Sequence, residues 1–312
     1  MIFNTGILYV LLVVWLICTF ADPIGHSVID ESRAQFLSTL TENDLNPQLW
    51  AKTHGSKSVE VYFNFYLEKL SKLYDTNNEV LSFMMIGACD GKSDRSILQF
   101  VQNRHWKGLF VEPVLQNVHD LRRMFVGEPQ FKGTHLASSR SIIVRGAALD
   151  HCVNDTVSLA RPPDSWLRDD TLPHWKSREL SKVFDPDVDK TYASWVVERV
   201  QCVTGVSLLR HWTDRYRDCV NCLHHKKQVA ARVDRMGINN SPEQTKTPTP
   251  ALDRGVRLDV LKVDTEGSDA HVLHGFDLER ARPDRRPLLV FFEVKLLSRP
   301  LGQETMAWLR NL

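Results

Sequence analysis

The chain alternates short apolar runs with longer amphipathic runs, and this alternation restricts its fold more than any other feature. The strand-like runs occupy residues 80–86, 108–111, 141–149, 258–263 and 287–294, and the helix-like runs occupy residues 95–103, 114–125 and 268–274. Such an order is typical of parallel strands, because a parallel pair needs a long crossover connection. The sequence therefore predicts an α/β fold with a Rossmann-like, doubly wound and mostly parallel sheet.

The composition gives no global hint of a partner. The 312 residues carry 39 basic and 38 acidic side chains, and the formal net charge is +1. A balanced charge of this kind produces no field that attracts nucleic acid, so no nucleic-acid partner is predicted. The choice of partner must come from local sites.

The N-terminal region contains an uninterrupted apolar run, residues 7–20. The run is short for a membrane span, which needs about 20 residues, and it suits the apolar part of a secretory signal peptide with small residues near the cleavage point. We predict a signal peptide over residues 1–21, with an uncleaved type II anchor as the second hypothesis and a buried helix as the third. The protein would then be secreted or lie in the lumen of the secretory pathway, touching the membrane only through this segment.

Entry into that compartment changes what the cysteines predict. Cys152, Cys202, Cys219 and Cys222 form an even set that is available for disulfides. The stretch 219–225 combines cysteine and histidine, so a disulfide to Cys202 or Cys152 is the first hypothesis for it and a zinc site the second. Sequons at Asn154 and Asn239 would accept glycans.

The runs divide the chain into unequal parts. Residues 22–80 are predicted to form an N-terminal helical extension, with an amphipathic helix over 59–74. The main domain is predicted over 81–296, with an insertion at 161–257 whose proline-rich part is expected to be a flexible loop. A tail, 297–312, has room for one short helix, so the C-terminal strands of the sheet are predicted to be short or missing.

A glycine turn follows the first apolar run of the domain. Gly87 and Gly91 lie where the first strand of a doubly wound sheet gives way to its helix, and backbone N–H groups exposed there can contact a ligand. Glycine permits a positive φ and leaves room for a close approach. Glu112 ends the next strand, at about the ~20-residue offset at which a carboxylate accepts the ribose hydroxyls of an adenosine-type ligand.

A second polar cluster follows the strand-like run at 258–263. Lys262, Asp264 and Glu266 place three ionisable groups at the carboxyl end of that strand. A carboxylate there can act as a general base or hold a metal, and it can also cap the following helix.

These residues together carry a resemblance to a known family. The stretches Ile86–Gly91 (IGACDG), Val111–Pro113 (VEP), Gly146–Asp150 (GAALD) and Leu261–Asp269 (LKVDTEGSD), followed by Val272–Gly275 (VLHG), resemble the FkbM family of methyltransferases in residue type, order and strand placement. The resemblance covers roughly residues 80–160 and 258–296. It implies a Rossmann-like enzyme that binds S-adenosylmethionine and methylates a hydroxyl oxygen.

The resemblance also implies site residues. Those expected to contact S-adenosylmethionine are Gly87, Ala88, Asp90, Gly91, Glu112 and Ala148, with Glu112 on the ribose diol. Asp264 and Glu266 are expected on the acceptor side, with Asp264 as the base for the hydroxyl proton and Lys262 as its electrostatic partner. By analogy and compartment, the acceptor is expected to be a sugar, a glycan or a small polyol.

Two other functions remain open at this point. A glycosyltransferase would use Asp264 and Glu266 as a metal-binding acid pair for a nucleotide-sugar. A binding protein that kept the fold without turnover is suggested by the short C-terminus and by Met85, which stands where the family usually has an acid.

Overall fold

The computed structural model of the protein describes residues 13–14, 35–36, 38–41, 44, 59–76, 80–91, 97, 99–101, 106–127, 141–161, 182–183, 195–214, 258–265, 268–281, 286–292 and 299–311.

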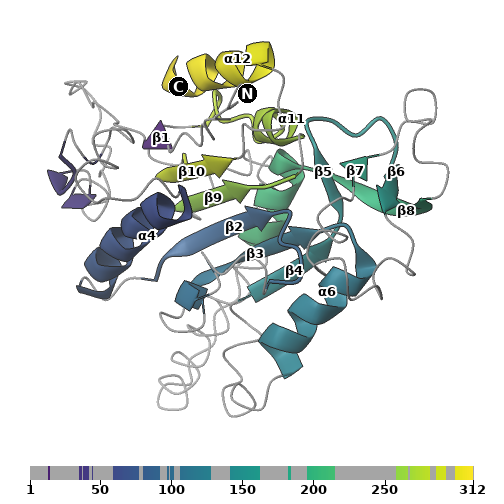
Figure 1. Ribbon diagram of the computed structural model, residues 1–312, viewed down its shortest axis with the longest axis horizontal. Helices are drawn as coiled ribbons and strands as arrows, with labels where there is room; N and C mark the ends of the chain where they lie inside the picture. Colours follow the sequence, from purple (N-terminus) through teal and green to yellow (C-terminus); the bar gives the residue numbers. More distant parts are fainter. Residues whose placement is uncertain are drawn as a thin grey trace, which may run out of the picture.

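A parallel sheet forms the centre of the molecule (Figure 1). Its parallel strands are β2 (Ser82–Ile86), β3 (Lys107–Glu112), β4 (Ser141–Arg145), β9 (Val260–Val263) and β10 (Leu289–Phe292). They lie in the order β10-β9-β2-β3-β4. The predicted doubly wound α/β fold is therefore confirmed, and the order reverses at β2, where such folds place their ligands.

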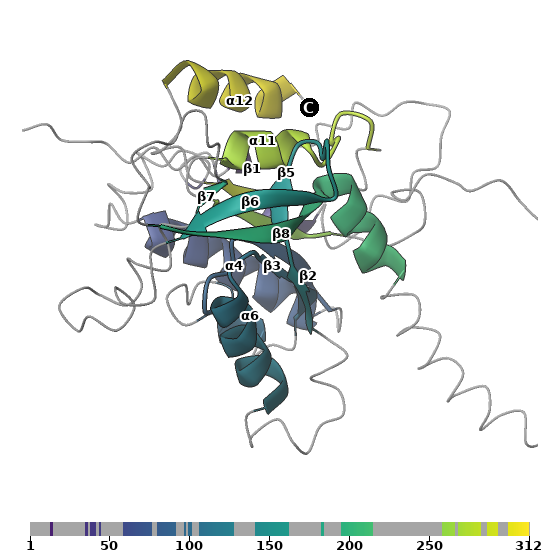
Figure 2. The ribbon, with the colours of Figure 1, turned by 90° about the vertical axis from the view of Figure 1, so that its right-hand side faces the viewer.

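Helices cover both faces of this sheet (Figure 2). On one face lie α4 (Val59–Thr76) and α6 (Leu115–Arg122), which continues as the π-helix η1 (Arg123–Gly127). On the other face lie α11 (Asp269–His274), α12 (Arg299–Asn311) and a helix over residues 205–214. The fold is a three-layer α/β/α sandwich.

Alternation along each strand divides the core into two clusters. On β2, Phe83 and Met85 pack in the cluster under α4, whereas Met84 and Ile86 pack in the cluster under α11. This follows from the two-residue period of a strand buried on both faces. Met85, which replaces the acid usual in the family, is 2% exposed and serves as a core side chain.

Helix α4 is part of the domain core. Tyr62, Phe63, Tyr66 and Leu70 of the predicted stripe are buried, and the ring of Phe63 lies 4.3 Å from that of Phe291 on β10. The predicted N-terminal extension is thus packed directly on the sheet. Aromatic side chains supply most of the apolar area that this helix removes from water.

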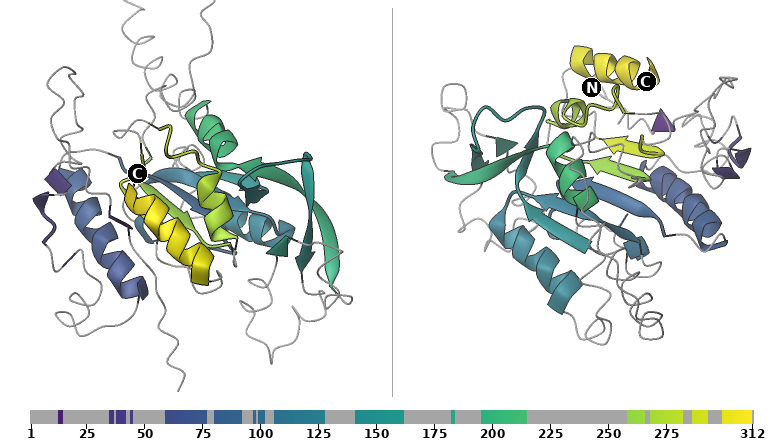
Figure 3. Two further views of the ribbon diagram at one scale, coloured as in Figure 1. Left: turned by 90° about the horizontal axis from the view of Figure 1, so that it is seen from above. Right: turned by 180° about the vertical axis from the view of Figure 1, so that it is seen from behind.

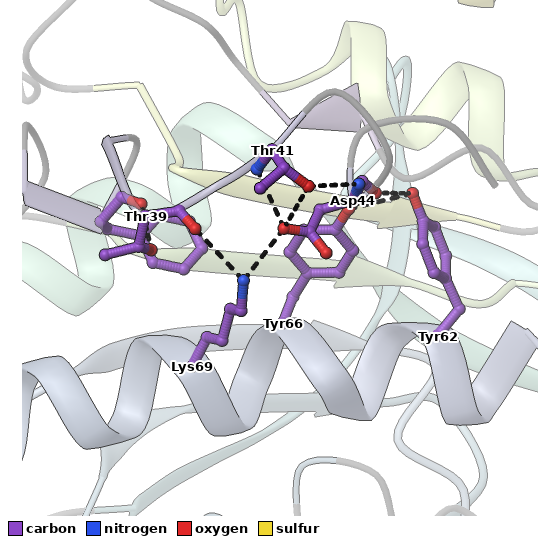
Figure 4. A network of polar contacts seen from close by, with 7 residues as sticks. Thr39, Thr41, Asp44, Tyr62, Tyr66 and Lys69 are labelled. Carbon is purple, nitrogen blue, oxygen red and sulfur yellow. Dashed lines mark hydrogen bonds and ion pairs between the residues drawn. The ribbon is translucent and has the colours of Figure 1, made fainter. Parts of the chain in front are cut away.

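Asp44 connects the described residues that precede α4 to this helix through hydrogen bonds (Figure 4). The Asp44 carboxylate accepts hydrogen bonds from the Thr41 backbone at 2.9 Å and from Lys69 Nζ at 3.0 Å, while the hydroxyls of Tyr62 and Tyr66 donate to the Asp44 carbonyl. Burial acts to raise the pKa of Asp44, but the hydrogen bonds from Thr41 and Lys69 outweigh it and hold the pKa below its usual value.

A second, smaller sheet lies at the carboxyl ends of the central strands, on the opposite side of the molecule from α4 (Figures 1 and 3). It has the order β5-β8-β6-β7, with strands β5 (Ala147–Leu149), β6 (Thr156–Arg161), β7 (Lys182–Val183) and β8 (Val196–Thr204). Strand β8 comes from the predicted insertion, as does the helix at 205–214. Both are integral to the fold.

The single strand-like run predicted at 141–149 is wrong in one respect, because Gly146 divides it between the two sheets. Residues before the glycine pair with β3, and residues after it pair with β8. A Cβ on Gly146 would lie 3.1 Å from the methyl groups of Val203, so β8 approaches the backbone closely at this point. Periodicity does not reveal such a change of sheet, because both halves are apolar.

One disulfide joins the second sheet to the loop after β5. Cys152 bonds to Cys202 on β8, and 50 positions separate them in the sequence. The hypothesis that residues 219–225 pair with Cys202 or Cys152 is therefore wrong, because those two cysteines bond to each other. Cys219, Cys222 and the possible zinc ligands around them lie outside the described residues.

The far edge of the central sheet is completed from the N-terminal apolar run. The two residues of β1 (Val13–Val14) pair antiparallel with β10. After β10, the described part of the chain forms α12, which includes the predicted tail helix and packs Met306 and Leu309 into the core under α11. Among the described residues, no helix is long and apolar enough to cross a membrane.

Candidate active site

The turn after β2 lies between the ends of two neighbouring strands. The N–H groups of Gly87 and Ala88 donate to the Val111 carbonyl on β3 at 2.9 and 3.1 Å, and the Asp264 N–H donates to the Ile86 carbonyl at 2.9 Å. The ends of β2, β3 and β9 are thus tied together at the position where the chain order reverses. The sequence predicted this meeting point.

Both glycines of the turn have the positive φ that was predicted. Gly87 has φ +78° and Gly91 has φ +72°. A Cβ on Gly87 would lie 1.8 Å from the Asp264 carbonyl oxygen, and one on Gly91 would lie 2.8 Å from Cδ2 of Leu121 on α6. The space that glycine leaves is filled by protein, so these residues first serve the close packing of the turn.

The backbone donors of the turn point into the protein. Besides the two bonds to Val111, the Cys89 N–H donates to Glu112 and the Gly91 N–H donates to the Ala88 carbonyl. The prediction that exposed N–H groups meet a ligand is therefore wrong for these four.

Glu112 occupies the tip of β3, where its carboxylate is fixed by three donors. Oε2 accepts the Cys89 N–H at 2.8 Å, and Oε1 accepts the Val114 N–H at 3.0 Å and Nδ2 of Asn117 at 3.1 Å. Glu112 is only 4% exposed. The carboxylate therefore has one orientation, facing the glycine turn.

Burial strongly changes the pKa of the Glu112 carboxyl group. Burial raises the pKa of Glu112 to about 7, because the hydrogen bonds from Val114, Asn117 and Cys89 offset only part of the cost of burying the charge, and nearby Asp90 repels it. Near neutral pH the protonated and ionised forms coexist. Perturbed carboxyl groups of this kind are common at functional sites.

Other predicted cofactor contacts differ in their exposure. Ala88 is fully buried, and Ala148 on β5 is 7% exposed and packs in the core cluster under α11. The side chains of these two residues support the site from within. Asp90 is partly exposed beside Glu112, so its side chain can reach a ligand.

The second polar cluster has the ion pair that the sequence predicted. Nζ of Lys262 lies 3.4 Å from Oδ2 of Asp264, and 5.4 Å from the centre of the Phe291 ring. The Lys262 side chain is 6% exposed and that of Asp264 is 35% exposed. The carboxylate is accessible and the ammonium group lies beneath it. Glu266 lies outside the described residues.

The loop after β9 is braced by an acid that the sequence analysis did not single out. Asp269 is fully buried at the start of α11, and its carboxylate accepts from the Thr265 N–H at 3.4 Å. An acid in the first turn of a helix is a common cap, so the sequence pattern does not distinguish Asp269 from an ordinary capping residue.

Asn117 is the other residue that the sequence analysis missed. It is fully buried on α6, among Val114, Val118 and Leu121, and it contacts Glu112. A signal was available, because a polar side chain interrupts an apolar stripe with helical spacing. Among the described residues, no three His, Cys, Asp or Glu side chains are grouped to hold a metal ion.

The fold and the turn are those of the doubly wound enzymes, a class of protein in which ligands bind at the strand-order reversal. The family model of the methyltransferase FkbM domain matches residues 86–312. The chain belongs to this family and is a methyltransferase, as the resemblance implied. A search of curated proteins and a search of solved structures each give no significant match.

Proposed function

We propose that the protein is an S-adenosylmethionine-dependent O-methyltransferase, which acts on a hydroxyl of a sugar or small polyol in the secretory pathway. The observation that carries this proposal is the fixed Glu112 carboxylate at the tip of β3, beside the turn 87–91. Oε2 accepts only the Cys89 N–H, so its second lone pair can accept a ribose hydroxyl in addition to the protein donors.

The residues present fit this cofactor. Glu112 supplies an acceptor for the ribose through Oε2, and the partly exposed Asp90 carboxylate of the turn supplies an acceptor for the amino group. Bound S-adenosylmethionine would supply a methyl group on a positively charged sulfur. Its transfer to oxygen requires alignment and removal of the hydroxyl proton.

Asp264 is placed to take that proton. Its side chain is partly exposed at the end of β9, and the Asp264 carbonyl adjoins Gly87, so it lies next to the cofactor turn. Lys262 at 3.4 Å fixes the carboxylate from the core side. Asp264 would therefore orient the acceptor hydroxyl and accept its proton as the methyl group arrives.

The compartment is supported by two features of the second sheet. The Cys152–Cys202 disulfide is of a kind that persists in oxidising environments. The sequon residue Asn154 lies on an exposed loop between β5 and β6, where an oligosaccharide can be attached. Both agree with entry of the protein into the secretory pathway.

The first test is calorimetric titration of the full chain with S-adenosylmethionine and S-adenosylhomocysteine. Both should bind, and Glu112→Gln should weaken binding at least tenfold, since a neutral amide replaces the diol acceptor. Glu304→Ala changes an exposed acid on α12 and should bind like the wild type. A folded wild-type chain that binds neither ligand would overturn the cofactor proposal.

Transfer itself is tested with S-adenosylmethionine carrying a labelled methyl group and a panel of glycans and polyols. Label in an O-methyl group, lost in Asp264→Asn, is the expected result. Binding without transfer to any hydroxyl acceptor would instead identify a binding protein that retained the fold.

The compartment needs its own measurement. Expression of the full chain in eukaryotic cells should give a glycosidase-sensitive product, and Asn154→Gln should remove one glycan. A chain without glycan and with a Cys152 thiol open to alkylation would contradict the secretory location.

A further inference from the structure

The hydrogen bonds of Glu112 include one from a side chain that the proposed reaction does not use. Asn117 on α6 donates Nδ2 to Oε1 of Glu112 at 3.1 Å and lies 3.9 Å from the Cys89 sulfur. Its partners thus come from β3 and from the glycine turn. One amide joins a helix to both parts of the proposed cofactor site.

The burial of Asn117 is unfavourable for the fold alone. The residue is fully buried, and no described group donates to its Oδ1. A buried acceptor without a donor costs free energy, and an apolar side chain at this position, between Val114 and Leu121 on the buried face, would avoid that cost. Compared with an apolar side chain, the Asn117 amide adds contacts with Glu112 and Cys89.

The proposal rests on the proposed function, because it concerns the same ligand. We propose that Asn117 is a positioning residue of the cofactor site, whose amide holds the Glu112 carboxylate in the ionised form that accepts a ribose hydroxyl through Oε2. A hydrogen bond from a neutral donor to a charged acceptor is stronger than one between neutral groups, so it favours that form.

The groups around Glu112 explain why such a donor matters. Asp90 in the turn repels a charged Glu112, and the Cys89 thiol contributes no positive charge. Arg145 on β4 is the register partner of Glu112, but its guanidinium donates to the Pro113 carbonyl at 3.3 Å and pairs with Glu198 at 3.0 Å. Asn117 is the side-chain donor to Glu112 among the described residues.

Protonation of Glu112 would make its contact with the Asn117 amide unfavourable. A protonated Glu112 carries its own O–H donor, which faces the Asn117 NH2 donor unfavourably unless the amide turns over. The ligand affinity of the wild type should therefore weaken as the pH falls below about 7, where burial places the pKa of Glu112.

The test is titration of the full chain with S-adenosylhomocysteine between pH 5.5 and 9, for the wild type and Asn117→Leu. At pH 7.5 the variant should bind about tenfold more weakly, and its binding midpoint should move up by about one pH unit. Gln116→Ala, on the exposed side of the same helix, is the matched control and should change neither quantity.

A double-mutant cycle separates positioning from a general structural effect. If Asn117 acts through Glu112, Asn117→Leu should change the affinity of a Glu112→Gln protein less than about threefold. An equal loss in both backgrounds, or an unchanged midpoint in Asn117→Leu, would overturn the inference. If Asn117→Leu does not fold, Asn117→Asp is measured instead; its added negative charge should also move the midpoint upward.

The two proposals fail in different ways. A wild type that does not bind S-adenosylhomocysteine at any pH would overturn the proposed function, and the positioning role with it. A wild type that binds, with Asn117→Leu behaving identically, would overturn only the role of Asn117.

Discussion

The central sheet carries a buried acid at each end, and the two acids have different surroundings. At the amino end, Asp259 accepts hydrogen bonds from Tyr74 Oη at 2.9 Å, from the Ser82 N–H at 2.8 Å and from Ser82 Oγ at 2.9 Å. At the carboxyl end, Glu112 also accepts three. Asp259 is fully buried and Glu112 is 4% exposed.

The partners of the two acids differ in what they connect. Those of Asp259 belong to α4 and β2, and its own carbonyl accepts from the N–H groups of Leu288 and Leu289 at the start of β10, so it joins a helix to three strands. Those of Glu112 belong to a turn, a strand end and a helix around the proposed ligand site. The hydrogen bonds of Asp259 thus support the fold at one end of the sheet, and those of Glu112 support a site at the other.

The largest expected effect comes from breaking the amino-end cluster. Asp259→Ala should lower the free energy of unfolding by about 4 kcal/mol, because it leaves three buried donors without an acceptor. Urea unfolding measures this, and Asp259→Asn, which keeps one carbonyl acceptor, should cost less. A loss below about 1 kcal/mol would show that the cluster is not important for stability.

Glu112, the acid at the carboxyl end, should instead affect how the free energy of unfolding depends on pH. Its pKa rises from 4.5 to about 7 on folding, so between these values the folded state binds more protons than the unfolded state. The free energy of unfolding should therefore fall by about 3 kcal/mol as the pH rises through that window. Denaturant titrations from pH 4 to 8 measure this change, and Glu112→Gln should flatten it. The same slope in that variant would assign the effect to other groups.

An intermediate effect is expected from the glycine turn. Gly91→Ala should cost about 2 kcal/mol, since an L-residue is strained in the left-handed region and the new methyl group must displace Leu121. Thermal unfolding measures the loss. Because Gly91 adjoins the proposed cofactor site, this variant should weaken S-adenosylhomocysteine binding, whereas Asp259→Asn should leave binding unchanged. Loss of binding in both would remove the distinction between the two ends.

The smallest effect on stability should come from Lys262→Met. Methionine matches the length of the buried stem, and Asp264 retains contact with water, so the free energy of unfolding should change by no more than about 1 kcal/mol. Methyl transfer should nevertheless fall, because Asp264 loses the cation that fixes it. Full activity in this variant would argue against the ion pair as part of the acceptor site.

The predictable part of the fold consists of elements whose pattern is local. The helix expected over 59–74 and the strands around 82–86, 108–111 and 260–263 follow from periodicity alone. The change of sheet at Gly146 does not, because strand β8, more than 45 positions later, creates the pairing partner for β5. Sequence patterns also left the partner of Cys152 open, since connectivity depends on which loops meet.

The candidate site also has a part that the sequence predicts and a part that it does not. The residue types and their order predicted Gly87, Gly91, Glu112 and the Lys262–Asp264 pair, because turns and strand ends at one edge of a parallel sheet meet in space. The direction of the N–H groups in the turn, and the contact of Asn117 with Glu112, were not predictable from the sequence, since both depend on side chains from separate elements.

The class of fold, the meeting point of three strand ends and the family of the chain can all be inferred from the sequence. Those properties follow from alternation, glycine positions and acids at strand ends, each encoded within a few neighbouring residues. The different roles of the two buried acids come from the tertiary structure, in which Asp259 joins the elements of the fold and burial raises the pKa of Glu112 to about 7. Burial and donors are supplied by residues far apart in the chain, and their balance fixes the charge of a buried acid.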